Sequence, residues 1–230
     1  MTKKSEYQLL VSKRKNCRDC MSLNEKFVIT NQHETSYDTS SIGKWSDWQG
    51  NLDAKIMVIG QDWGSYNHWM AYQGQGSDEN RTNINLIQLF EVLGYDIGLV
   101  SNPNPKAPVF FTNAALCLKG ELKTGKMSSR VLKQCFRNCG TKFLKPLIDI
   151  IKPEILITLG KAPFSSILKL YDTEGWNKIP LMRNVVRQKP VLLNGLGLKL
   201  FPVFHCGGLG IRNRSLEEQK KDWQSIKEWL

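Results

Sequence analysis

Three residues with chemically useful side chains stand at, or just beyond, the ends of apolar runs. Asp62 follows the run at residues 56–59, Asn113 lies late in the run at 109–116, and His205 follows the run at 198–204. If these runs are parallel strands, their carboxyl ends share the sheet edge where open α/β folds bind ligands. A carboxylate, a carboxamide and an imidazole would then converge on one crevice and offer acid–base and hydrogen-bonding chemistry to one substrate. Taken singly, each residue could equally be a turn cap, a helix cap or a buried structural side chain.

The cysteines form a second chemical group. Thiols stay reduced in the cytoplasm, so clustered cysteines there favour metal binding over disulfides. The spacing of Cys17 and Cys20, with two residues between them, places two thiolates within reach of one metal. Together with Cys135 and Cys139 this pair could form a tetrahedral zinc site of four thiolates. Cys206 is compatible with a buried thiol that binds no metal, as is one of Cys135 and Cys139.

The elements that must position these residues alternate between strands and helices. Buried strands are predicted at residues 56–59, 109–116, 155–160 and 198–204. Apolar periodicity and stop signals predict helices at residues 85–93, 143–151 and 162–171, and a last helix that begins with a capping box at Ser215. The sequence therefore predicts an α/β fold of three α/β/α layers around a central, mostly parallel, four-stranded sheet. We expect a single domain over residues 1–230, in which the polar residues 1–53 form an N-terminal arm with the first cysteine pair.

The charge of the chain favours a polyanionic partner. The formal net charge is +11, and surplus Lys and Arg favour nucleic acid through counterion release. Between Lys119 and Lys145 there are eight basic residues and one acid, Glu121. A solvated surface would show a similar surplus. No apolar run is long enough to cross a membrane, and residues 1–6 lack a signal-peptide pattern, so we expect a cytoplasmic protein that binds no membrane.

Four motifs occur in order along the chain, and together with the cysteines they resemble one family. They are Gly60-Gln61-Asp62-Trp63-Gly64, Thr112-Asn113-Ala114-Ala115-Leu116-Cys117, the segment Lys152 to Ala162, and Pro202-Val203-Phe204-His205-Cys206-Gly207-Gly208. Their order and content resemble the uracil-DNA glycosylase superfamily, most closely its family 4, whose members hold an iron–sulfur cluster. The resemblance runs from Cys17 to about Asn213, and each motif alone is weak.

The resemblance implies roles for the residues at the predicted sheet edge. Asp62 would orient a water and stabilise the cationic sugar, and His205 would donate to the developing oxyanion on uracil O2. Asn113 would read the edge of the uracil, whose nucleotide must flip out of the duplex to reach a pocket. Further substrate-binding residues would be Gly60, Gln61 through its backbone amide, and an aromatic that stacks on the base, for which the candidates are Trp63, Trp69 and Tyr72.

The resemblance also implies a metal centre. Cys17, Cys20 and Cys117 match three ligands of the family 4 cluster, and Cys139 is our choice for the fourth, with Cys135 as its rival. Four thiolates suit a [4Fe–4S] cluster, which we expect in preference to zinc. Its expected role is structural, to tie the arm and the basic segment to the body.

Some residues depart from the family 4 pattern. Gln61-Asp62 is closer to family 1, Trp63 replaces a proline, and the loop after His205 reads Cys-Gly where the family has Pro-Ser. We expect a monomeric, monofunctional glycosylase that removes uracil from single- or double-stranded DNA. The alternative on the same fold is a damaged-DNA-binding protein that does not turn over or that traps its target covalently, and a third is a glycosylase for another damaged base.

Overall fold

The computed structural model describes most of the chain. It describes residues 1–20, 51–63, 77–117, 129–173, 181–186, 189–193 and 197–230, without the side chains of residues 15 and 129–132. No described helix is long and apolar enough to cross a membrane.

The described strands form one mostly parallel sheet with the order β2-β1-β3-β5-β4. They are β1 (Ile56–Gly60), β2 (Val109–Asn113), β3 (Ile155–Leu159), β4 (Val191–Leu193) and β5 (Leu198–Val203). The four predicted strands pair in parallel, which confirms the predicted fold class. The predicted number of strands was wrong, because β4 adds an antiparallel edge strand beside β5. β4 has only three residues, and its middle residue Leu192 is 62% exposed, so it lacks the long apolar run of a buried strand.

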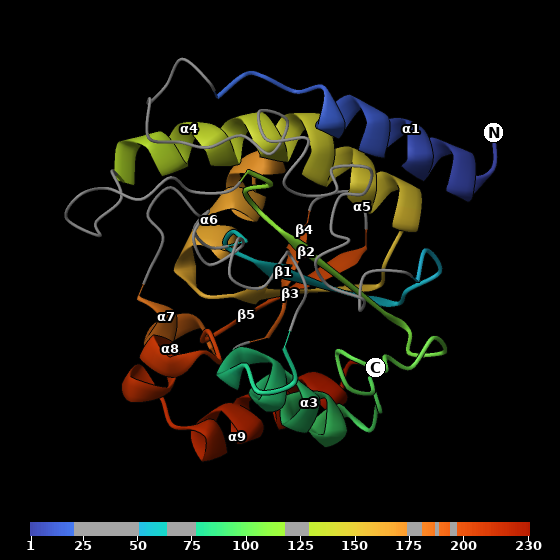
Figure 1. Cartoon of the computed structure of the whole chain (residues 1–230). Helices are drawn as coiled ribbons and strands as arrows, with labels where there is room; N and C mark the ends of the chain where they lie inside the picture. The colour runs from blue at the N-terminus through green and yellow to red at the C-terminus, as the bar shows by residue number, and fades with distance from the viewer. Residues whose placement is uncertain (21–50, 64–76, 118–128, 174–180, 187–188, 194–196) are drawn as a thin grey trace.

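Helices cover both faces of the sheet, so the fold has three layers (Figure 1). One face carries α1 (Lys3–Lys15), α4 (Ser129–Cys139), α5 (Lys145–Ile151) and α6 (Lys161–Leu170). The other carries α3 (Arg81–Leu93) and α9 (Leu216–Lys227). Two short helices, α7 (Met182–Val185) and α8 (Gly208–Asn213), flank β4 and β5 in the chain.

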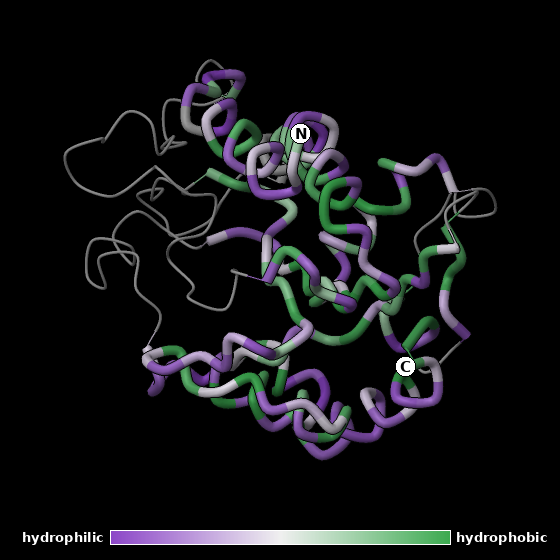
Figure 2. Tube along the Cα trace, turned by 90° about the vertical axis from the view of Figure 1, so that its right-hand side faces the viewer, coloured by the Kyte–Doolittle hydropathy of each residue, from purple (hydrophilic) through white to green (hydrophobic). Residues whose placement is uncertain are grey.

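Successive strand residues enter opposite cores. In β1, Met57 and Ile59 join the core under α5 and α6, while Ile56 and Val58 join the core under α3 and α9. This alternation follows from the pleat of a strand, in which neighbouring side chains point to opposite faces. The central strands are therefore mostly apolar, whereas the helices carry many hydrophilic residues (Figure 2).

Several helices extend beyond their predicted bounds. α3 begins at Arg81, four residues before the predicted start, because the Asn80 side chain accepts a hydrogen bond from the Thr82 N–H and caps the helix. The predicted helix at 143–151 is the end of a longer one, in which α4 continues through a π-helical turn (Gly140–Leu144) into α5. The capping box at Ser215 is confirmed, with Glu218 as its partner.

α9 is held against α3 by aromatic packing. Trp223 is fully buried, and its ring lies edge-on to Phe90 with the centroids 5.2 Å apart. Such a contact adds about 0.5–1.5 kcal/mol to the burial of the rings themselves. α3 and α9 therefore form one packed pair, next to the loop that carries His205.

Candidate active site and cysteine cluster

Asn113 and Gly60 end neighbouring strands in direct register. The Asn113 carboxamide lies over the Gly60 backbone, where a Cβ on residue 60 would be only 2.3 Å from Asn113 Oδ1. Only glycine fits at position 60 while Asn113 keeps this position. Asn113 is 8% exposed, and within the described residues its side chain makes no hydrogen bond. Buried amides normally have partners, so this donor and acceptor are available to a ligand.

The segment after β1 brings Asp62 towards His205. β2 continues to pair with this segment, since the Ala115 N–H donates to the Gln61 carbonyl at 3.0 Å. The Gln61 side chain donates to Asp62 Oδ2 at 2.9 Å, which orients the carboxylate. The Asp62 charge acts on the His205 imidazole and favours its protonated form. The carboxylate that follows β1 and the imidazole that follows β5 thus lie within electrostatic range of each other.

His205 extends from the end of β5 across the end of β3. A Cβ at Gly160, directly after β3, would lie 3.9 Å from His205 Cβ. The Asp62 charge acts on the imidazole, so the ring lies within electrostatic range of the segment that follows β1. The structure therefore places Gly60, Asp62, Asn113 and His205 at the same edge of the sheet, as the sequence predicted.

The protonation of His205 follows from its contacts. The Gly207 N–H donates to His205 Nδ1 at 2.9 Å, so Nδ1 carries a lone pair and the proton of the neutral ring is on Nε2. Burial lowers the pKa of His205 below its ordinary value, and the nearby Asp62 charge opposes that shift. At neutral pH the ring is a neutral imidazole that presents an Nε2–H donor.

The other predicted substrate-binding residues divide into two groups. Trp63 is half-buried and packs against the core beneath α5 and α6. Trp69 and Tyr72 lie outside the described residues, as does part of the basic segment between Lys119 and Lys145.

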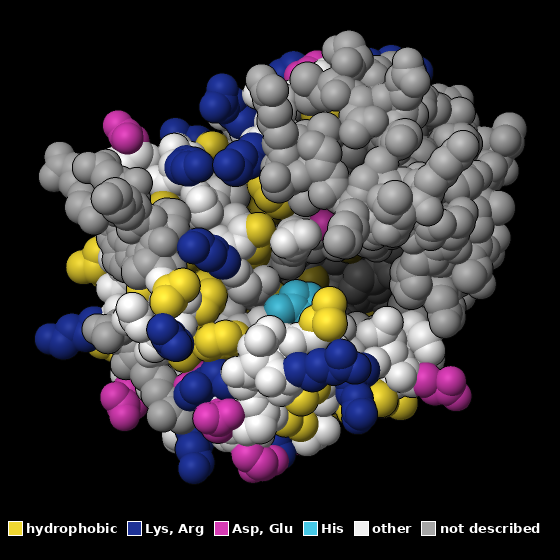
Figure 3. All heavy atoms as spheres, turned by 90° about the vertical axis from the view of Figure 1, so that its left-hand side faces the viewer, with side chains coloured by type: hydrophobic (Ala, Val, Ile, Leu, Met, Phe, Trp, Pro, Cys, Tyr) yellow, Lys and Arg dark blue, Asp and Glu magenta, His cyan; other side chains and the backbone are white. Residues whose placement is uncertain are grey.

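Leu209, which the sequence analysis did not single out, stands on α8 four residues beyond His205. It is 77% exposed, the most exposed large apolar side chain of the described residues after Met1. Arg212 on the same helix is also exposed. Figure 3 shows the described histidine at the surface, with apolar and basic side chains around it. From the sequence alone, a leucine after an apolar run is expected to belong to the hydrophobic core. Only the exposure of its side chain in the structure shows that Leu209 is a surface residue close to His205 in the chain.

Four cysteine thiols contact one another where three segments meet. The Cys20 thiol lies within hydrogen-bonding distance of Cys117 and Cys135, and Cys117 also contacts Cys139. Cys20 follows α1, Cys117 follows β2, and Cys135 and Cys139 are one turn apart on α4. All four are buried, whereas Cys17 is half-buried and lies within electrostatic range of Cys139. The structure thus gathers all five of the predicted and rival ligands.

The surroundings act differently on the five thiols. They lower the pKa of Cys20 and Cys139, and they raise the pKa of Cys17, Cys117 and Cys135, for which burial is among the causes. Hydrogen bonds from Cys117 and Cys135 lower the pKa of Cys20 to about 3. Cys20 also accepts from Asn138 Nδ2 at 3.5 Å, and Cys139 accepts from the Leu116 N–H at 3.4 Å. The buried guanidinium of Arg14 donates to the Leu116 carbonyl, beside Cys117. The positive charge of Arg14 acts on Cys117 and Cys139 and favours their thiolate forms.

The donor set suits a thiolate-bound metal or cluster in type and number. All six cysteines belong to the described part of the chain and are free thiols. Five of them gather at this place, and buried thiolates with N–H donors are the ligands that iron–sulfur clusters use. In the described residues, however, no group of three or more His, Cys, Asp or Glu side chains is already arranged around a metal position. Cys206 lies apart in the other core and is fully buried, which raises its pKa to about 12.

Comparison with known proteins gives one assignment. No curated protein matches the chain. The family model of the uracil DNA glycosylase superfamily matches residues 48–228, which include the whole sheet and both Asp62 and His205. The chain therefore belongs to the uracil DNA glycosylase superfamily.

Proposed function

We propose that this protein is a monofunctional DNA glycosylase that hydrolyses the N-glycosidic bond of uracil, or of a closely related damaged base. The observation that carries the proposal is the Asn113 carboxamide, which is buried at the sheet edge and makes no hydrogen bond within the described residues. The superfamily to which the chain belongs favours DNA glycosylase activity, and Asp62 and His205 stand at the same edge.

Base selection is assigned to Asn113. Its carboxamide offers one acceptor and two donors, which match the N3–H and O4 of uracil. Cytosine has the opposite pattern at these positions, so it would leave a buried amide with a mismatched partner. A mismatch of this kind discriminates strongly, because buried polar groups without partners are costly.

Bond cleavage is assigned to Asp62 and His205. As the glycosidic bond breaks, positive charge develops on the sugar and negative charge on the leaving base. The Asp62 carboxylate, oriented by Gln61, would stabilise the sugar cation and direct a water to it. The neutral His205 would donate from Nε2 to the anionic base, since Nδ1 is occupied by the Gly207 N–H.

Leu209 is assigned to the extrusion of the base. A base inside a duplex must flip out to reach such a pocket, and apolar wedges help to unstack DNA. Leu209 is exposed on the segment that also carries His205, which suits insertion into the stack beside the flipped nucleotide.

The test is release of uracil from a labelled oligonucleotide. Hot alkali should cleave the strand only after incubation with the protein, and the protein alone should leave it intact. Asp62→Asn and His205→Ala should each lower the single-turnover rate by about 10²-fold or more. Asp149→Asn removes an exposed carboxylate on α5 and is the matched control. Uncut strand for both single- and double-stranded substrates would refute activity on uracil, and an adduct stable to denaturant would point to trapping instead of turnover.

We further propose a [4Fe–4S] cluster held by four of the gathered thiols, with zinc as the alternative. Cys20 and Cys117 each contact two other thiols, so they are the central ligands of the proposal. Cys17, Cys135 and Cys139 are the candidates for the remaining two positions. When bound, the group would act as a covalent link between α1, β2 and α4.

A further inference from the structure

Two buried amides from separate helices hold the backbone of the loop that carries His205. Asn85 Nδ2, on α3, donates to the Cys206 carbonyl at 2.7 Å. Gln219 Nε2, on α9, approaches the His205 carbonyl at 3.5 Å. Asn85 is 2% and Gln219 1% exposed, so both contacts are shielded from water. Successive carbonyls at the catalytic loop are therefore held from both of the helices that cover this face.

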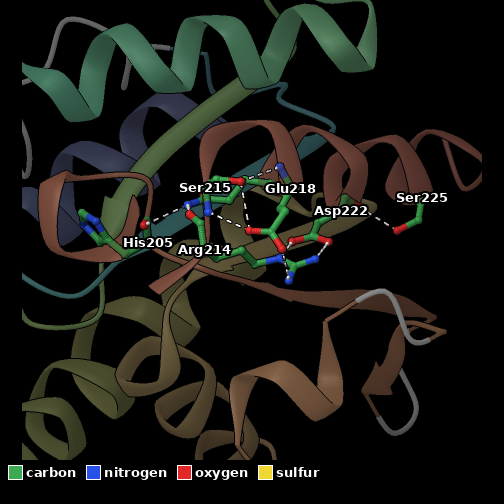
Figure 4. Close-up of polar contacts among 7 residues, drawn as sticks. His205, Arg214, Ser215, Glu218, Asp222 and Ser225 are labelled. Atoms are coloured by element: carbon green, nitrogen blue, oxygen red, sulfur yellow. Dashed lines mark hydrogen bonds and ion pairs between the residues drawn. The ribbon is translucent and has the colours of Figure 1, made fainter. Parts of the chain in front are cut away.

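Gln219 also closes the segment that follows. Its Nε2 donates to the Arg214 carbonyl at 3.0 Å, so one amide reaches both ends of residues 205–214. Figure 4 shows His205 and the start of α9 joined by these contacts. The start of α9 is itself fixed, because Arg214 forms a two-bond ion pair with the buried Asp222 and Ser215 caps the helix through Glu218.

The orientation of the imidazole depends on this backbone. The ring lies against Gly207, where a Cβ would be 2.9 Å from both Cε1 and Nδ1 of His205. A Cβ at Gly210 would overlap the His205 carbonyl, so α8 also packs directly on this peptide. Because the ring is fixed by the peptide from residue 205 to 207, a shift of the two carbonyls would move Nε2 as well.

We propose that Asn85 and Gln219 are positioning residues that aim Nε2 of His205 at the leaving base. The inference rests on the proposed function for its catalytic readout, and on the hydrogen bonds above for its geometry. Neither amide touches the substrate. Both act through His205, and small misplacements of a catalytic group cost large factors in rate.

The test is a double-mutant cycle between the amides and His205. Asn85→Leu and Gln219→Met remove the donors at nearly constant volume. Each should lower the single-turnover rate on uracil-containing DNA by about 10-fold or more, with the affinity for DNA unchanged. In the His205→Ala background each should have an effect of less than about twofold, since residues that act through one group are not additive. A full 10-fold loss in that background would overturn the proposal.

Ser166→Ala is the matched control, because Ser166 is also a buried polar residue but lies on α6 in the opposite layer. It should leave the rate unchanged. Thermal unfolding of every variant shows whether a lower rate comes from loss of the fold or from a changed orientation of the His205 ring. Gln219→Met provides the second, independent variant if Asn85→Leu does not fold.

A spectroscopic readout is independent of activity. In ¹⁵N-detected spectra, the His205 ring, identified by the loss of its signals in His205→Gln, should show a protonated Nε2 and an unprotonated Nδ1. Asn85→Leu and Gln219→Met should mix the two tautomers. Wild-type ring signals in both variants would overturn the inference. If wild-type protein does not release uracil but the variants mix tautomers, the proposed function fails while the positioning role stands.

Discussion

The backbone N–H of Gly207 donates a hydrogen bond of 2.9 Å to Nδ1 of His205. A second proton on the ring would have to go to Nδ1, where it would face another donor. Burial already disfavours the charged ring and lowers its pKa, although Asp62 opposes that shift. The arrangement therefore keeps His205 neutral, with its proton on the nitrogen that faces away from Gly207.

The first prediction concerns pH. The single-turnover rate should be constant as pH falls towards the ordinary histidine pKa of about 6.5, and should decline only below it, as the lowered pKa of His205 is crossed. The unfolded chain binds this proton more readily than the folded one. The contribution of neutral His205 to the free energy of unfolding is therefore fully present above the pKa of this histidine in the unfolded chain. It is lost as pH falls through the lower pKa of His205 in the folded protein. Rates between about pH 5 and 8 check this, with His205→Gln as the variant that cannot titrate. A rate that rises on acidification would show that the cationic ring is the active form.

The second prediction concerns Gly60. In Gly60→Ala the new Cβ would lie 2.3 Å from Asn113 Oδ1, so the carboxamide must move. We expect kcat/KM for uracil to fall by about 10²-fold, because the substitution displaces the amide that we propose to read the base. Gly140→Ala is the control, since its Cβ would make only an ordinary contact of 3.5 Å with Leu170. If Gly60→Ala were as active as the wild type, Asn113 would not be a residue that binds the substrate.

The third prediction concerns Leu209. Because its side chain is exposed, Leu209→Ala should leave thermal stability almost unchanged. Activity should fall by about 10-fold on duplex substrate and much less on single strands, where no stacked partner must be replaced. Single-turnover rates on the two substrates provide the comparison. The same loss on both would mean that Leu209 does not help to extrude the base.

The fourth prediction concerns the cysteines. The purified protein should absorb at about 400 nm if it holds an iron–sulfur cluster. Cys20→Ser and Cys117→Ser should lose iron and absorbance, because these two thiols each contact two others. Cys206→Ala should retain both, since Cys206 is buried in the other core. Iron content of the Cys17, Cys135 and Cys139 variants then ranks the remaining ligands. A colourless protein that contains stoichiometric zinc would contradict the cluster and show that the thiols bind zinc instead.

The sheet could be predicted because its central strands are buried on both sides. Residues such as those at 56–59 and 155–159 enter the two cores alternately, so nearly every position is apolar and the run is conspicuous. β4 escaped prediction because an edge strand of three residues needs no such run. α1, within the polar N-terminal segment, anchors itself with few apolar residues, chiefly Leu10 and Val11.

Residues of the candidate site could be predicted from the sequence only where a side chain with useful chemistry stands at the end of a predicted strand. Asp62, Asn113 and His205 fulfil that condition, and the structure places them at one edge. Asn85 and Gln219 do not, because an isolated amide on an amphipathic helix gives no sign of the carbonyl that it holds. The pairing of Cys135 and Cys139 on one helix face follows from their spacing of four, but their contacts with Cys20 and Cys117 depend on how α4 and α1 pack.

Gln219 contacts the carbonyls at both ends of residues 205–214, and these contacts would link the movements of His205 and Leu209. His205 and Leu209 belong to the same short segment, whose ends are fastened to one side chain. A displacement of this segment by DNA would carry the His205 imidazole and the Leu209 side chain together. Entry of the leucine into a duplex and arrival of the imidazole at the base would then be a single event.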